Sequence, residues 1–201
     1  MKILIGSTNP GKAAELERCV RELGFETVLP AELDLGSVEE TGATFEENAI
    51  LKATTYAKAS GLVTLADDSG LEIDALGGAP GVYSRRWAGE DATDLKLAVT
   101  VIDRLKPFPA NKRAARLKCV VAVARPDGEV ATAWSAIEGR IAEELDASKI
   151  IPGMPYRSLL IVDGYGKLYA DLTPEEHAEA NHRRKACQKI APELIRLAGQ
   201  P

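Results

Sequence analysis

The stretch LVTLADDSGLEIDALGGAPGVYSRRWAGEDAT, residues 62–93, decides how this chain is organised. Its apolar start, residues 62–66, predicts a short buried strand that runs directly into Asp67 and Asp68. If the strand continues, the two carboxylates point to opposite faces, because side chains alternate along a strand. Residues 69–90 are rich in glycine, and a glycine-rich segment of this length inside a compact domain favours a functional role.

The chain before this stretch alternates strand and helix. Apolar runs predict strands at residues 2–5 and 25–29. Between them, Asn9 is a favourable N-cap, Pro10 suits the first helical position and Gly24 ends the helix.

A second helix begins at Thr44, whose spacing to Glu47 forms a capping box, and it ends at Gly61. Downstream we expect a helix at 91–105, strands at 115–124 and 129–137, a hairpin from 156–162 and 167–169, and a broken helix at 173–197. Helices mixed with strands, with hairpins in the second half, predict an α/β fold with a mixed sheet.

Composition restricts the classes of protein to consider. The 201 residues, 45% hydrophobic and 27% charged, predict a single globular domain over 1–201. The net charge of −5 argues against nucleic acid or an anionic membrane as a partner. An odd set of distant cysteines, Cys19, Cys119 and Cys187, gives no disulfide framework and favours a reduced cytoplasm. We find no signal-peptide pattern and no apolar run long enough for a bilayer.

The segment GSTNPGK, residues 6–12, lies between the first strand and the first helix. Backbone N–H groups at a helix start attract anions, so the segment predicts a phosphate cradle. Its further donors are Ser7, Thr8, Asn9 and Lys12. An ordinary capped helix with a surface lysine has the same pattern. The spacing also matches a P-loop except at Ala13, where a hydroxyl is required, so a P-loop NTPase or kinase is an alternative.

Carboxylates supply a second candidate site. Asp67 and Asp68 offer the hard oxygen ligands that Mg²⁺ prefers, although a turn with local backbone bonds fits the same residues. Glu39 and Glu40 are candidates for a further carboxylate ligand, although a solvated acidic loop is the simpler interpretation in isolation.

Two groups of cations have simple structural interpretations. Lys52 borders the apolar stripe of its helix, and a lysine there more often reaches solvent than a cleft. The basic run at residues 182–185 is typical of a solvated helix face.

Taken in order, four segments resemble the family of inosine triphosphate pyrophosphatases, also called dITP/XTP diphosphatases. They are STNPGK at 7–12, EETGATFEENAILKA at 39–53, ADDSGLEIDALGGAPGVYSRRWAGEDAT at 66–93 and ADLTPEEHAEANHR at 170–183. The third segment is long and unusual, and it carries most of the resemblance.

The resemblance implies a curved mixed sheet flanked by helices, in two lobes with a central cleft, and a homodimer. It implies hydrolysis of modified purine nucleoside triphosphates to the monophosphate and pyrophosphate, which removes them from the nucleotide pool. The reaction would require Mg²⁺, with water attacking the α-phosphorus.

The resemblance also implies roles for individual residues. Asp68 would be general base and metal ligand, and Glu39, or else Glu40, its metal partner. Lys12 and Lys52 would complete the catalytic set, and their joint presence with Asp68 counts against a third hypothesis, a non-catalytic nucleotide-binding module. Substrate contacts would come from Ser7, Thr8, Asn9, Lys12, Ser69, Tyr156, His177, His182 and Arg183.

The base-recognition end departs from the family pattern. Where the family has GFGYDP, this chain has GMPYRS at 153–158, which replaces an aromatic residue by Met154 and an aspartate by Arg157. His177 stands for a lysine and Asn181 for a serine. Because arginine is only a donor where aspartate is an acceptor, we predict an altered base preference.

Overall fold

Strands of 3 to 12 residues form one mixed sheet. The computed structural model of the protein describes residues 1–199. Within this range the strands are β1 (Lys2–Ile5), β2 (Glu26–Val28), β3 (Thr64–Ile73), β4 (Ala114–Ala124), β5 (Val130–Ile141) and β6 (Leu160–Val162). Their order is β2-β1-β3-β4-β5-β6, and β1 pairs in parallel with β2 and β3, whereas β5 and β6 are antiparallel. The predicted mixed α/β class is confirmed.

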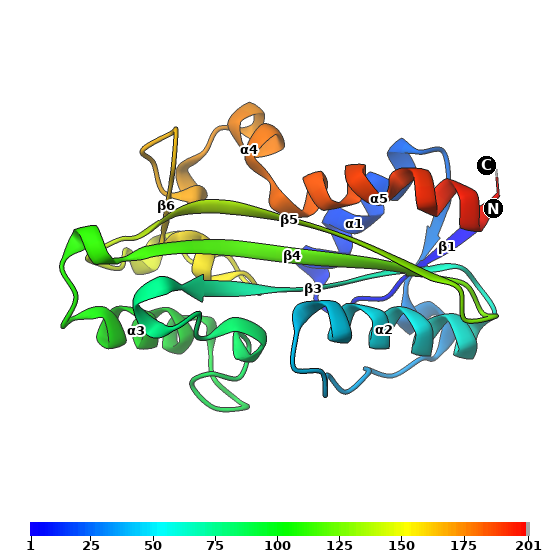
Figure 1. Ribbon diagram of the computed structural model, residues 1–201, viewed down its shortest axis with the longest axis horizontal. Coiled ribbons are helices and arrows are strands. Elements are labelled where there is room, and N and C mark those ends of the chain that lie inside the picture. The colour runs from blue at the N-terminus through cyan, green and yellow to red at the C-terminus, as the bar shows by residue number, and fades with distance from the viewer. Residues whose placement is uncertain (200–201) are drawn as a thin grey trace. The chain divides into compact units, whose positions relative to one another are not determined.

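The helices follow the predicted capping signals closely. They are α1 (Pro10–Glu22), α2 (Phe45–Ser60), α3 (Asp94–Leu105), α4 (Pro174–Ala180) and α5 (His182–Ala198), as Figure 1 shows. Asn9 caps α1, and Thr44 with Glu47 forms the predicted capping box of α2. The predicted break in the last helix lies at Asn181, which separates α4 from α5. None of the helices in residues 1–199 combines the length and apolar content needed to span a membrane.

The chain forms two compact units, which correspond to the two predicted lobes. Unit 1 comprises residues 1–68, 119–135 and those from Arg183 onward, and unit 2 comprises residues 69–118 and 136–182.

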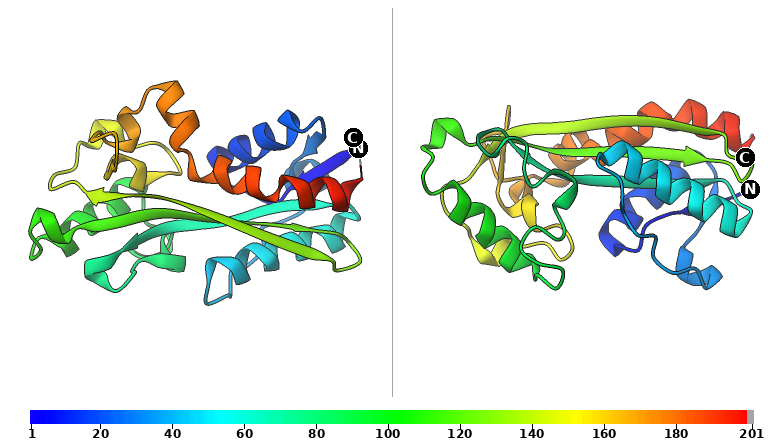
Figure 2. Two further views of the ribbon diagram at one scale, coloured as in Figure 1. Left: turned by 45° about the horizontal axis from the view of Figure 1, so that its top comes forward. Right: turned by 60° about the horizontal axis from the view of Figure 1, so that its bottom comes forward.

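Alternation along β1 places helices on both faces of the sheet in unit 1. Ile3 and Ile5 face a core made by α1 and α5, whereas Leu4 packs with Tyr56 of α2 on the other face. Figures 1 and 2 show α1 and α5 together on one face and α2 on the opposite face. A side chain on the unit 1 part of β3 therefore meets either α1 and α5 or α2, according to its position in the alternation.

The chain leaves β1 at Gly6. A Cβ atom there would lie 2.9 Å from the Cβ of Ala66, closer than real Cβ atoms approach, and it would crowd Cδ2 of Tyr56 at 3.0 Å. The close approach therefore requires glycine, and it fixes the start of the loop at residues 7–9.

In unit 2, α3 packs on a separate apolar core that includes Leu71, Leu97 and Leu159. The glycine-rich stretch is ordered around Ser84, whose hydroxyl accepts a bond from the Leu71 N–H (2.9 Å) and donates one to a carbonyl (2.6 Å). A Cβ at Gly70 would overlap this hydroxyl, so glycine is required there as well.

Two predicted elements were wrong in extent. β3 continues to Ile73 instead of ending before the acidic pair, because pairing in the sheet overrides the turn-forming character of Ser69 and Gly70. The expected strand from residue 156 is a 3-10 turn over Pro155–Ser158, followed by the short β6, and proline suits the start of such a turn. The predicted hairpin is present in shortened form, with an antiparallel bridge from Ile161 to Leu168 and a hydrogen bond from the Val162 N–H to the Lys167 carbonyl (2.8 Å).

Candidate active site

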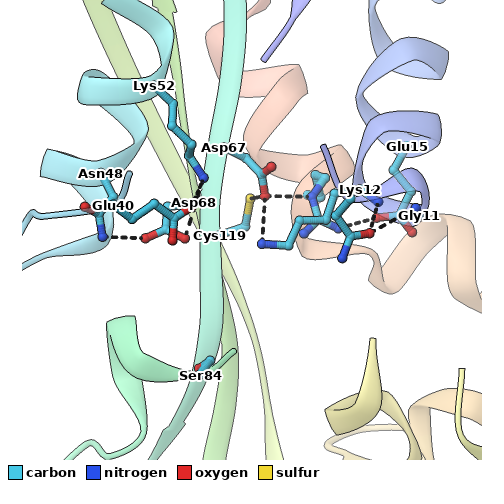
Figure 3. Close-up of polar contacts among 12 residues, drawn as sticks. Gly11, Lys12, Glu15, Glu40, Asn48, Lys52, Asp67, Asp68, Ser84 and Cys119 are labelled. Atoms are coloured by element: carbon cyan, nitrogen blue, oxygen red, sulfur yellow. Dashed lines mark hydrogen bonds and ion pairs between the residues drawn. The ribbon is translucent and has the colours of Figure 1, made fainter. Parts of the chain in front are cut away.

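β3 carries two adjacent carboxylates to opposite faces of the sheet. Asp67 is fully buried and Asp68 is 3% exposed. In Figure 3 the two side chains leave the strand in opposite directions, as the alternation predicts. The last β1 residue paired with β3 is Ile5, opposite Leu65, so both acids lie just beyond the carboxyl end of β1. Ligand sites of α/β proteins typically form at this end of parallel strands.

Asp67 faces α1 and α5. Its Oδ2 accepts a hydrogen bond from Nε of Arg183 (3.1 Å), and Nζ of Lys12 lies 4.0 Å from the same oxygen. The Arg183 guanidinium also pairs with Glu15 of α1, and Sγ of Cys119 lies 3.7 Å from Asp67 Oδ2. Arg183 is only 2% exposed, so the interpretation of residues 182–185 as a solvated face is wrong at this position.

These cations decide the protonation state of Asp67. Burial alone would raise the pKa of its carboxyl group, but the charges of Arg183, Lys12 and Lys52 outweigh it and hold the pKa well below the ordinary 3.8. Asp67 is therefore a permanent carboxylate that fixes the position of two cations.

Asp68 faces α2. Its Oδ2 accepts a hydrogen bond from Nδ2 of Asn48 (3.0 Å), and its Oδ1 lies 3.9 Å from Nζ of Lys52. Lys52 also donates to Oε1 of Glu40 at 2.6 Å. The Lys52 residue is 8% exposed, so the interpretation of this lysine as a solvent-directed side chain is wrong.

The pKa of Asp68 shifts opposite to that of Asp67. Burial raises it above the ordinary 3.8 and Glu40 adds to the rise, whereas Lys52, Lys12 and Asn48 only partly offset them. For Lys52, burial opposes the charge, but the surrounding carboxylates prevail and raise its pKa above 10.5. The α2 side thus combines an unusually basic carboxylate with an ammonium group that stays charged.

The predicted phosphate loop lies beside the acidic pair, as the 4.0 Å contact of Lys12 with Asp67 shows. Asn9 Oδ1 accepts the backbone N–H groups of Gly11 (3.0 Å) and Lys12 (3.1 Å), so this side chain caps α1. Ser7 is half-buried and Thr8 is exposed. The structure therefore confirms the helix cap and brings the cradle and the acids together in unit 1.

The P-loop alternative fails at the position where the sequence departs from it. Ala13 is 4% exposed and packs in the α1–α5 core, where it supplies no hydroxyl to a metal.

The remaining predicted substrate residues lie in unit 2. The Tyr156 hydroxyl donates to the backbone carbonyl of Ser84, and burial raises the pKa of the phenol. Ser69, which follows Asp68, is half-buried.

The two histidines flank Tyr169. The ring of His177 lies edge-on to Tyr169 with centroids 5.0 Å apart, and that of His182 lies at 6.2 Å. The Arg157 guanidinium stacks over the same tyrosine at 4.8 Å, and its Nη1 is 3.5 Å from Nε2 of His177. Two departures from the family pattern, Arg157 and His177, therefore contact each other.

Sequence reasoning missed Asn48, Glu15 and Tyr169. Asn48 precedes Lys52 by four residues and so shares its helix face, and this spacing is the signal that could have found it. No comparable local signal links Tyr169 to Arg157.

Magnesium is compatible with the donors on the α2 side. Within residues 1–199, no three His, Cys, Asp or Glu side chains gather into a group able to hold a metal alone. Mg²⁺ is usually held by one or two carboxylates, waters and substrate phosphates. Asp68 and Glu40, which both face the Lys52 ammonium, provide this donor chemistry, whereas Glu39 is exposed.

Comparison with known proteins identifies the family. A model described as the Ham1 family matches residues 3–193. The chain belongs to the Ham1 family. A relative from Exiguobacterium sibiricum, named dITP/XTP pyrophosphatase, is 38% identical over 201 residues and covers both chains completely. Another with this name, from Thermus thermophilus, is 42% identical over 190 residues, 94% of this chain and 90% of its own.

Solved structures extend the Ham1 assignment to the fold. A HAM1 protein from Coxiella burnetii superposes with a TM-score of 0.85 at 35% identity, covering 98% of this chain and 99% of its own. The family resemblance inferred from the sequence segments is therefore confirmed.

Proposed function

We propose that this Ham1-family enzyme hydrolyses dITP, XTP and related purine nucleoside triphosphates to the nucleoside monophosphate and pyrophosphate. One observation carries the proposal: a buried carboxylate, Asp68, stands beside the charged Lys52 at the carboxyl end of β1, in a chain whose relatives are named dITP/XTP pyrophosphatase.

Asp68 is the general base of this reaction. Water attacks the α-phosphorus, its proton passes to the Asp68 carboxylate, and the bond to pyrophosphate breaks. Burial first, and Glu40 second, raise the pKa of Asp68 and make it a stronger base than an exposed aspartate. The bond from Asn48 fixes the plane of the carboxylate, which leaves Oδ1 toward Lys52.

Lys12 and Lys52 neutralise the triphosphate. Phosphoryl transfer depends mainly on positioning and on stabilising negative oxygens, and both lysines act electrostatically on Asp67 and on Asp68. The raised pKa of Lys52, caused by carboxylates that outweigh burial, keeps its charge throughout the neutral range.

Asp68 and Glu40 are the residues that would hold Mg²⁺. When bound, the ion supplies positive charge to the phosphate oxygens. Glu40 replaces Glu39 in this assignment because Glu40 reaches Lys52 at 2.6 Å whereas Glu39 is exposed.

Base preference is the part of the function that we expect to differ from the relatives. Arg157 is 7% exposed, stacks on Tyr169 and lies beside His177, so its guanidinium is a fixed donor where the family pattern has an acceptor. An unpaired buried polar group costs about 1–3 kcal/mol, which is about 5- to 150-fold in discrimination.

Product analysis with a nucleotide panel tests both statements. ITP, dITP, XTP and the standard nucleotides are supplied with Mg²⁺, and pyrophosphate and orthophosphate are measured separately. Pyrophosphate with equimolar monophosphate is expected; orthophosphate would support a P-loop-like NTPase and contradict the proposal. A strong ordinary preference for ITP and XTP would refute the altered base preference, and Arg157→Asp is expected to shift the preference toward those substrates.

A homodimer and a cytoplasmic location complete the proposal. The resemblance supports the dimer, and the three free cysteines fit a reducing compartment. Light scattering is expected to give twice the chain mass of 21.5 kDa, and a monomer at micromolar concentration would refute the dimer.

A further inference from the structure

Two cysteines far apart in the sequence lie on neighbouring helices of unit 1. Cys19 lies on α1 and Cys187 on α5, and each thiol shifts the pKa of the other. Cys187 is 4% exposed, whereas Cys19 is half-buried. Both pack in the apolar core that joins these helices.

An ion pair one helical turn before the two cysteines fixes the level of α1 against α5. Glu15 precedes Cys19 by four residues, Arg183 precedes Cys187 by four, and Glu15 pairs with Arg183. A second pair, Arg184 with Glu22 at 3.3 Å, braces the same two helices. The two cysteines therefore lie at the same level of two neighbouring helices.

The two thiols differ in reactivity. The neighbouring Cys187 thiol lowers the pKa of Cys19, and the charge of Arg184 acts in the same direction. The Cys19 thiol, together with burial, raises the pKa of Cys187. The accessible member of the pair thus has the greater thiolate character, and the buried member lies ready to react with it.

We propose that Cys19 and Cys187 form an oxidation site at which a peroxide produces an intramolecular disulfide between α1 and α5. The Cys19 thiolate attacks one peroxide oxygen, the O–O bond breaks, and the departing hydroxide takes a proton to become water. The Cys187 sulfur then attacks the Cys19 sulfenic acid, the S–S bond forms, the S–O bond breaks and a second water leaves. Two thiols lose two electrons, and hydrogen peroxide becomes two waters.

The disulfide joins the helix that follows the phosphate loop to the helix that carries Arg183. Because it closes a very long loop between two helices that already pack on each other, it restricts the unfolded chain more than it strains the folded one. For a chain of this size the expected rise in Tm is on the order of 5–10 °C.

The test oxidises the folded full-length protein with hydrogen peroxide, alkylates the remaining thiols and maps the peptides by mass spectrometry. We expect a Cys19–Cys187 linked peptide lighter by two hydrogens, and a rise in Tm that dithiothreitol reverses. Cys119 is the internal control, because it is fully buried and burial raises the pKa of its thiol. It should be alkylated only after unfolding.

Two variants make the test specific. Cys19→Ser should remove both the linked peptide and the rise in Tm, and Cys187→Ser should leave Cys19 as a sulfenic acid that dimedone traps. Separate alkylation of both cysteines after peroxide treatment of the wild-type protein, or linkage of either to Cys119 instead, would overturn the proposal. The wild-type map decides the question even where a serine variant does not fold.

Discussion

Asp67 and Asp68 are neighbours in the sequence, yet the two faces of β3 give them opposite properties. On the α1–α5 face, Arg183 and Lys12 outweigh burial and keep the pKa of Asp67 low. On the α2 face, burial and Glu40 prevail over Lys52, and the pKa of Asp68 is raised. The number and distance of cationic partners, rather than the residue type, therefore determine which carboxylate holds structure together and which is basic enough for chemistry.

The Asp67 side differs from the Asp68 side in what it contributes to folding. Arg183 is buried with Asp67 and Glu15 as its partners. Removal of a partner from a buried charge of this kind strongly destabilises the folded protein. The Lys52 ammonium lies 3.9 Å from Asp68, farther than Arg183 lies from Asp67. The cost of burying the Asp68 charge is therefore only partly offset. Substitution of Asp67 should consequently affect mainly stability, and substitution of Asp68 mainly turnover.

The largest effect on stability is expected from Asp67→Asn. The substitution removes one carboxylate partner of the buried Arg183, and breaking such a pair costs about 3–5 kcal/mol in the free energy of unfolding. Urea unfolding measures the change, with the exposed Glu39→Gln as matched control. The double variant Asp67→Leu with Arg183→Met should recover most of the loss, and a single-variant loss below about 1 kcal/mol would refute the assignment.

Substitutions of Glu39 and Glu40 should show which of these two neighbouring glutamates acts in the reaction. Glu40→Gln weakens a charged hydrogen bond to Lys52, which is worth about 1.5–3 kcal/mol, so kcat/KM is expected to fall about 10- to 150-fold. Glu39→Gln changes an exposed side chain and should leave kcat/KM within about twofold. Equal losses in the two variants would contradict the choice of Glu40.

A smaller effect is expected in the pH dependence of stability without metal. Because the folded pKa of Asp68 is raised, its ionised form costs stability at neutral pH, and the cost disappears as the pH falls through that pKa toward 3.8. Asp68→Asn should therefore raise Tm at pH 7 and lose this advantage near pH 4.

Asp67 should behave in the opposite way. Its lowered pKa gives stability that is present above 3.8 and is lost only as the pH falls below that value. The difference in Tm between the wild type and Asp67→Asn should thus persist from pH 7 to about pH 4. Thermal unfolding in EDTA at both pH values measures the two differences, and parallel changes in the two variants would contradict the comparison.

The sequence predicted those features that depend on local pattern. The opposite orientation of Asp67 and Asp68 followed from strand alternation, and the helix starts at Asn9 and Thr44 followed from capping residues. The burial of Arg183 was not predictable in this way, since its partner Asp67 is 116 residues away in the sequence. Lys52 was misjudged for the same reason, because its carboxylate partners come from β3 and from the loop at Glu40.

Turnover of Asp68→Asn compared with that of Asp67→Asn shows which of the two carboxylates carries the chemistry. Pyrophosphate release from dITP is measured well below both Tm values and divided by the folded fraction of each variant. Loss of the general base should reduce kcat of Asp68→Asn by about 10²- to 10⁴-fold while nucleotide binding persists. Folded Asp67→Asn should lose far less, and an equal or larger loss in Asp67→Asn would contradict the assignment of the chemistry to Asp68.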